Sequence, residues 1–221
     1  LGNNDQNKPS EELRYDPNKP DIGRLPVIAR ELAQTVRGLD ASRPVTLALA
    51  SPPLSNLAGL SDTVDVVGYN YMEACYRDDH RAYPQRVIFG SENSQTVEAW
   101  LAVWENRYIS GQFLWTGADY LGEAKGWPVR VSTAGMLDTA NHEKPLYDLL
   151  LALWTGALCC RLATSASGDI RKETYGWQYP KSETVTVSCY TNAARATLYV
   201  NGRAWETADV GNAARAVWRV P

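Results

Sequence analysis

The chain has 221 residues, of which 44% are apolar and 21% charged, so it can build a hydrophobic core for one large domain or two smaller ones. The formal net charge of -3 and the pI near 5.5 leave no basic surface of the kind that nucleic acid needs. No apolar run approaches the roughly 20 residues of a transmembrane helix. We therefore expect neither a nucleic acid nor a membrane as a partner.

The aromatic residues point weakly towards sugars. Eight Trp and twelve Tyr occur beside only two Phe. Trp and Tyr combine a flat apolar face with a polar edge, which suits the faces of sugar rings. β-Rich proteins are also rich in both residue types, so composition alone leaves both interpretations open.

The cysteines argue against a structural zinc site. Cys75, Cys159, Cys160 and Cys189 form no C-x-x-C pair, and the chain has only two His. Cys159 and Cys160 are adjacent, which disfavours a bond between them. The redox compartment does not follow from this pattern.

Both ends of the chain are expected to be truncated. Residues 1–20 are polar, begin without Met and carry no charged-then-apolar signal pattern, which predicts a surface loop from a longer chain. At the other end the segment AVWRVP stops inside a strand-like pattern at Pro221.

The first two thirds of the chain alternate between apolar strand-like runs and helical patterns. Apolar residues recur at helical spacing over 25–39, and again over 96–106 and 144–154. The expected strands are 45–50, 64–71, 86–93 and 108–120. Strands that are apolar throughout are typical of parallel sheets covered on both faces. The alternation predicts a β/α architecture.

From about residue 160 the sequence pattern changes to short runs in which apolar and polar residues partly alternate, as in β-strands. VTVSCY and ATLYVNG have this pattern, and Asn201-Gly202 is a strong signal for a hairpin turn. The segment predicts an antiparallel β-sandwich module that is incomplete at Pro221.

Polar and aromatic residues gather where the expected strands of the first part end. In a β/α barrel, the carboxyl ends of the strands form the active face, and four strands are half of such a barrel. The residues at these ends are Asn70, Tyr71, Glu92, Asn93, Trp115 and Asp119.

Glu92 is the strongest candidate for chemistry. It ends the apolar run RVIFGSEN, where burial of an unpaired charge would cost several kcal/mol. The alternative is a helix cap or a salt bridge at a strand-to-helix turn. For Tyr71 and Trp115 the alternative is simple packing at the rim of the sheet.

Four segments resemble one enzyme family. They are VDVVGYNY, IFGSEN, GQFLWTGADYLGE and AGMLDTANHEKPLYDLLLALW. Together they are similar to the second half of the catalytic barrel of glycoside hydrolase family 2, in particular the β-galactosidase-like branch of gut bacteria. The tail VTVSCYTNAARATLYVNGRA resembles the β-sandwich module that follows this barrel.

The resemblance implies an α/β fold with three parts. Residues 1–157 would form the C-terminal half of a TIM (β/α)8 barrel, about its strands five to eight. Residues 158–180 would be a linker, and residues 181–221 would start an immunoglobulin-like sandwich.

The resemblance also implies residue roles. Glu92 would be the catalytic nucleophile with Tyr71 beside it, and Trp115 would line the sugar pocket. The remaining substrate-binding positions would be Asn70, Asn93 and Asp119. The acid/base Glu of this family ends strand four, which would lie upstream of the chain. Glu11 and Glu12 lack its Asn-Glu motif.

The function implied by the resemblance is that of a retaining β-glycosidase, with β-galactosidase as the first choice, which acts through a covalent glycosyl-enzyme. This chemistry needs no metal and no organic cofactor, so we expect neither. Relatives that act on glucuronides carry an Asn-x-Lys element that WPVRVSTAG, with Arg130, lacks. β-Glucuronidase and β-mannosidase stay as alternatives, as does a catalytically inactive carbohydrate-binding fragment. The isolated chain is expected to be inactive. By resemblance alone, the intact enzyme can be a homo-oligomer and periplasmic or secreted.

Overall fold

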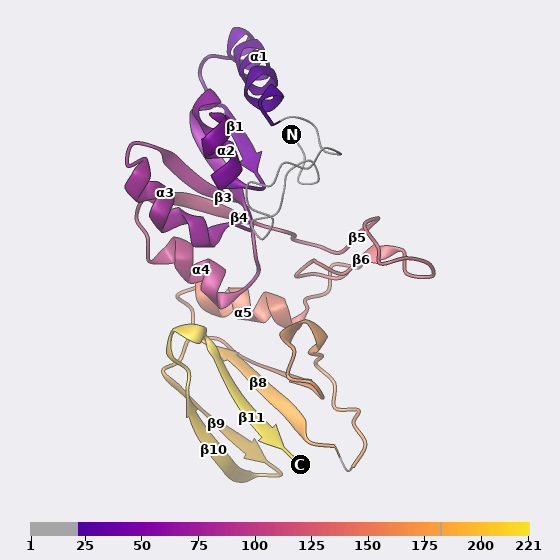
Figure 1. Ribbon diagram of the computed structural model, residues 1–221. Helices are drawn as coiled ribbons and strands as arrows, with labels where there is room; N and C mark the ends of the chain where they lie inside the picture. The colour runs from indigo at the N-terminus through magenta and orange to yellow at the C-terminus, as the bar shows by residue number, and fades with distance from the viewer. Residues whose placement is uncertain (1–21, 182) are drawn as a thin grey trace. The chain divides into compact units, whose positions relative to one another are not determined.

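A computed structural model describes residues 22–181 and 183–221 (Figure 1). The expected loop over residues 1–20, with Glu11 and Glu12, lies outside the described residues. The chain divides into two compact units, Leu1–Trp115 and Thr116–Pro221. Among the described residues, no helix has the length and apolarity to cross a bilayer.

The first unit is built on a four-stranded parallel sheet with strand order β1-β2-β3-β4 (Figure 1). Its strands are β1 (Thr46–Leu49), β2 (Val66–Asn70), β3 (Val87–Asn93) and β4 (Ile109–Leu114). The expected parallel sheet is therefore present. The fourth strand ends at Leu114 instead of residue 120, because its partner β3 ends at Asn93, directly opposite Leu114.

Helices follow or precede each strand of this sheet. They are α1 (Arg24–Leu39), α2 (Pro52–Ala58), α3 (Tyr76–Ala82) and α4 (Val97–Trp104), with 3-10 turns η2 (Ser61–Thr63) and η3 (Glu73–Cys75). The SPP segment over residues 51–53 starts α2, because Pro is tolerated in the first turn of a helix. Gly59 ends α2 with a φ of 72°.

One face of the sheet forms the core of the first unit. Alternate strand residues Val67, Tyr69 and Ile88 are almost fully buried and pack with Leu25 and Ala29 of α1. The opposite face is less covered, since the Phe113 side chain is 67% exposed. The helices thus cover one side of the sheet, and the other side presents Phe89 against Phe113.

The described residues of the second unit form one α-helix, α5 (Pro145–Trp154), and small antiparallel sheets. A two-stranded sheet joins β5 (Tyr120–Leu121) and β6 (Val131–Ser132). A three-stranded sheet has the order β11-β8-β7, and a further pair joins β10 to β9 (Figure 1). Their bounds are β7 (Cys160–Ser165), β8 (Val185–Thr191), β9 (Arg195–Val200), β10 (Arg203–Asp209) and β11 (Arg215–Val220).

A common core lies between these two last sheets. It contains Val187 and Cys189 of β8, Leu198 of β9, and Ala216 and Trp218 of β11. The hairpin predicted at Asn201-Gly202 is confirmed, because both residues have positive φ, 51° and 75°, and join β9 to β10.

The three-stranded sheet begins at Cys160, inside the segment 158–180 that was expected to be a linker. Strand β7 lies inside that segment and pairs with β8 from Cys160 to Ser165. All seven residues of β8 are buried. A buried strand needs backbone partners on both sides, and β7 supplies one of them while β11 supplies the other.

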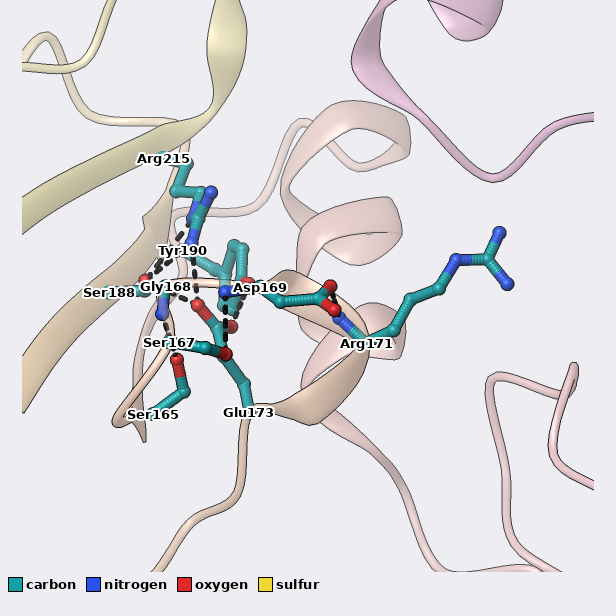
Figure 2. Close-up of polar contacts among 9 residues, drawn as sticks. All are labelled: Ser165, Ser167, Gly168, Asp169, Arg171, Glu173, Ser188, Tyr190 and Arg215. Carbon is teal, nitrogen blue, oxygen red and sulfur yellow. Dashed lines mark hydrogen bonds and ion pairs between the residues drawn. The ribbon is translucent and has the colours of Figure 1, made fainter.

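A network of polar side chains lies against the three-stranded sheet (Figure 2). The Glu173 side chain has no exposed surface and accepts hydrogen bonds from Ser188 Oγ at 2.6 Å and from the Tyr190 hydroxyl. Arg215 Nη2 lies 2.6 Å from Glu173 Oε1. Burial raises the pKa of Tyr190, so its hydroxyl stays protonated as the donor. The network joins the end of η4 (Ile170–Lys172) to β8 and β11.

Candidate active site

The carboxyl ends of β2, β3 and β4 bring five of the six predicted site residues to one edge of the first unit. In the β2–β3 ladder Asn70 stands opposite Glu92. The Tyr71 amide donates to the Glu92 carbonyl, with 2.7 Å between N and O. The Trp115 amide donates to the Asn93 carbonyl at 3.4 Å. Parallel strands all end on the same side, so these contacts follow from the direction of the sheet.

Glu92 is half-buried at the end of β3. Within residues 22–181 and 183–221 its carboxylate belongs to no ion pair, unlike that of Glu173. A carboxylate that is partly open and has no neutralising cation can meet a ligand without first breaking a structural contact.

A bulge in β3 shapes this edge. Tyr69 stands opposite Gly90 and Asn70 opposite Glu92, so Ser91 is an extra residue in β3. Ser91 Oγ donates to Asn70 Oδ1 at 2.6 Å. The serine hydroxyl therefore fixes the amide of Asn70, which is itself only 4% exposed.

Asn93 lies inside the protein instead of at the surface. Its side chain is fully buried, accepts from the Tyr76 hydroxyl at 2.9 Å and donates to Gln112 Oε1 at 3.0 Å. Burial raises the pKa of Tyr76, which keeps that phenol protonated as a donor. The contacts are those of a residue that holds β3 against its neighbours.

Two aromatic rings border the same edge. Tyr71 is 43% exposed and Trp115 is 40% exposed. Tyr71 has a left-handed φ of 54°, which turns the chain sharply at the end of β2. Exposed Tyr and Trp rings at a polar rim offer the flat apolar surface that sugar rings stack on.

The sixth predicted site residue, Asp119, lies in the second unit. Its Oδ1 accepts from Lys144 Nζ and from the Gly135 amide, both at 2.8 Å, and its side chain is 8% exposed. Gly135 is needed here because a Cβ would collide with the backbone at Ala118 and Asp119.

The sequence did not point to three supporting residues. Ser91 bonds Asn70, Gln112 bonds Asn93, and Glu73 Oε1 accepts from the Ser94 amide at 2.8 Å. The sequence could have indicated these residues only through their positions close to the predicted ends of the strands. In the described part of the chain, no cluster of three or more His, Cys, Asp or Glu could hold a metal ion.

Comparison with known proteins gives sequence relatives among glycosidases. No family model matches the chain. The β-galactosidase BoGH2A of Bacteroides ovatus is 25% identical over 245 residues, which cover 88% of this chain and 27% of that protein. A putative β-glucuronidase of Formosa agariphila is 29% identical over 132 residues, covering 55% of this chain and 12% of that protein.

Solved structures show the same similarity. A glycosyl hydrolase family 2 member from Bacteroides cellulosilyticus superimposes with a TM-score of 0.77 and 25% identity over 90% of this chain and 30% of that one. A β-glucuronidase from Bacteroides uniformis has the same fold, with a TM-score of 0.70 and 17% identity over 90% of this chain and 28% of that one.

The chain spans less than a third of the length of these relatives. The similarity nevertheless extends over both of its units, since it covers about 90% of the chain. The resemblance to glycoside hydrolase family 2 is thereby confirmed: the chain is a relative, in sequence and in fold, of members of that family.

Proposed function

We propose that the protein containing this chain is a retaining β-glycosidase with Glu92 as its nucleophile. The observation that carries the proposal is the position of Glu92, half-buried at the carboxyl end of a parallel strand and in no ion pair within the described residues. The similarity to a β-galactosidase and to family 2 structures supports it.

The proposed reaction needs two carboxyl groups about 5 Å apart. Glu92 would attack the anomeric carbon, and the bond from this carbon to the leaving oxygen would break. The second carboxyl group, on a segment upstream of the chain, would protonate that oxygen. It would then remove a proton from the water that hydrolyses the glycosyl-enzyme.

The other edge residues would bind and orient the sugar. Asn70, held by Ser91, offers a fixed amide next to Glu92. Tyr71 and Trp115 offer exposed rings for its apolar face. We assign Asn93 a positioning role, because its side chain is fully buried. For Asp119, whose carboxylate is held by Lys144 and the Gly135 amide, the proposed substrate-binding role rests on the family resemblance.

We further propose that the first unit is part of a (β/α)8 barrel. The four strands are parallel and follow one another in sequence order, as consecutive strands of such a barrel do. In the described part of the sheet, β1 and β4 each have one strand neighbour. The remaining strands would come from the upstream part of the protein.

Neutral β-galactosides are the proposed substrates, ahead of β-glucuronides. The stretch from Trp127 to Gly135 lacks the Asn-x-Lys element, and its Arg130 guanidinium lies over the Trp127 ring, 4.6 Å from the centroid. The similarity to a putative β-glucuronidase keeps glucuronides as the second candidate. Hydrolysis of matched aryl β-galactoside, β-glucuronide and β-mannoside distinguishes them.

The test of the nucleophile is Glu92→Gln in the full-length protein. We expect hydrolysis of aryl β-glycosides to fall by at least about 1,000-fold, because the covalent step is lost, while the sugar still binds. Glu98→Gln, an exposed glutamate on α4, is the matched control and should leave turnover unchanged. Wild-type turnover in the Glu92→Gln enzyme would refute the assignment.

A further inference from the structure

Two of the four cysteines lie in contact across the β7–β8 pair. Cys160 Sγ and Cys189 Sγ are 3.6 Å apart. In the antiparallel ladder Cys160 stands opposite Thr191, and Cys189 stands opposite Leu162. The two cysteines are therefore diagonal neighbours on the same face of the sheet. Cys160 is the first residue of β7, so a small shift at the strand end can bring the sulfurs together.

The surroundings of the two thiols differ. Cys160 is exposed, whereas Cys189 is 2% exposed and belongs to the core between the sheets. Burial, with the contact to Cys160, raises the pKa of the Cys189 thiol to about 12. A reagent in solution therefore meets Cys160 first, and Cys189 is reached only through it.

The neighbouring Cys159 is directed elsewhere. Its amide donates to Asn192 Oδ1 at 3.1 Å, and its Sγ lies 3.9 Å from the same oxygen. Although Cys159 and Cys160 are adjacent in sequence, only Cys160 has its sulfur against Cys189.

We propose that Cys160 and Cys189 form a thiol–disulfide exchange site whose co-substrate is a low-molecular-weight disulfide such as oxidised glutathione. The Cys160 thiolate attacks one sulfur of the reagent, its S–S bond breaks, and one thiolate leaves. The Cys189 thiol then loses its proton as its sulfur attacks the Cys160 sulfur, and the second thiolate of the reagent is expelled. The two cysteines are oxidised to one disulfide, the reagent is reduced to two thiols, and the two cysteine protons end on those thiols.

The product would close a loop from Cys160 to Cys189. This loop contains η4 and Glu173, the centre of the buried network (Figure 2). A crosslink of this kind restricts the unfolded chain and stabilises the folded one. Oxidation would therefore lock the first strand of the three-stranded sheet onto its central strand, and reduction would release it.

The test uses the full-length protein, treated with oxidised glutathione, blocked with an alkylating agent and digested with trypsin without reduction. Mass spectrometry should find the peptide ending at Arg161 joined to the peptide that contains Cys189. The oxidised protein should also unfold at a higher temperature, and a thiol reductant should reverse the shift.

Single variants identify the cysteine. Cys159→Ser should keep the crosslink, and Cys160→Ser should abolish it. Reduced Cys160→Ser should unfold at the wild-type temperature, because the replaced side chain is exposed. A crosslink that survives in Cys160→Ser, or glutathione that remains attached to Cys160 without a link to Cys189, would overturn the proposal.

Discussion

Glu92 and Glu173 are glutamates with opposite surroundings. Glu173 has no exposed surface and meets Arg215, Ser188 and Tyr190. Glu92 is half-buried and has no ion pair within the described residues. The carboxylate of Glu173 is enclosed by its partners, whereas that of Glu92 is partly exposed, as the proposed nucleophile requires. In the sequence Glu92 ends an apolar run, whereas Glu173 stands in the polar stretch GDIRKETYG, so its burial could not be predicted.

Asp148 on α5 is a third carboxylate whose surroundings lead to a pH prediction. It is 1% exposed, its Oδ2 accepts from the Tyr175 hydroxyl at 2.8 Å, and Arg161 Nε is 3.8 Å away. Burial raises the pKa of Asp148 above its usual value. The folded state therefore binds a proton that the unfolded chain has already lost, and stability falls as pH rises through this window.

Asp148→Asn should remove this part of the pH dependence. The amide oxygen can still accept from Tyr175, but the side chain no longer titrates. We expect the unfolding free energy of the variant to fall less than that of the wild type as pH rises from about 4 towards neutrality, measured by urea unfolding. Asp209→Asn, an exposed position on β10, should behave like the wild type. Parallel curves for Asp148→Asn and wild type would contradict the prediction.

At the scale of elements, the end of β3 depends on a glycine. The Asn93 side chain lies against Gly90, where a Cβ would collide with its amide group. Asn93 is in turn held by Tyr76 and Gln112. The bulge at Ser91 and the close approach at Gly90 together determine where the backbone of Glu92 lies.

Gly90→Ala should therefore affect both stability and catalysis. The added methyl group must displace Asn93, at a cost of about 1–3 kcal/mol, and should lower glycosidase turnover by shifting Glu92. Gly111→Ala in the neighbouring strand β4 is the matched control, because a Cβ there has open space within 4 Å. Its change should stay within about 0.5 kcal/mol. Equal effects of the two substitutions would show that the contact with Asn93 is unimportant.

At the scale of the whole molecule, each unit has its own stabilising contacts. The first rests on a sheet covered by helices on one face. The second rests on the core between two antiparallel sheets and on the Glu173 network. The Arg215–Glu173 pair joins residues 42 positions apart, which makes it a contact of the folded unit as a whole.

Arg215→Met should destabilise the second unit strongly. It leaves the Glu173 charge buried without its cation, which costs about 3–5 kcal/mol. The double variant Glu173→Gln/Arg215→Met should recover much of this loss. Arg219→Met, an exposed arginine on the same strand, is the control. The free energy of unfolding of all three variants can be measured by urea unfolding, with Trp fluorescence as the signal. An Arg215→Met variant as stable as the wild type would exclude a net stabilising role for the Arg215–Glu173 pair.

Much of the architecture followed from local pattern. Helical spacing predicted α1, α4 and α5, and continuous apolar runs predicted β1, β2 and β3. Burial followed the helical pattern only in part: α1 buries Leu25 and Ala29, whereas Leu32, Val36 and Leu39 of the same pattern are exposed. The short helices α2 and α3 were not predicted, because seven residues carry too little periodicity to rise above a loop pattern.

The sequence by itself determined the alternation of strands and helices, the Asn201-Gly202 turn and the presence of polar residues at the strand ends. These depend on neighbours along the chain. Only the tertiary structure decided that Ser91 holds Asn70, that Asn93 is buried, and that Cys160 touches Cys189. Register, bulges and strand pairing place these atoms, and they depend on residues distant in sequence, which local patterns do not encode.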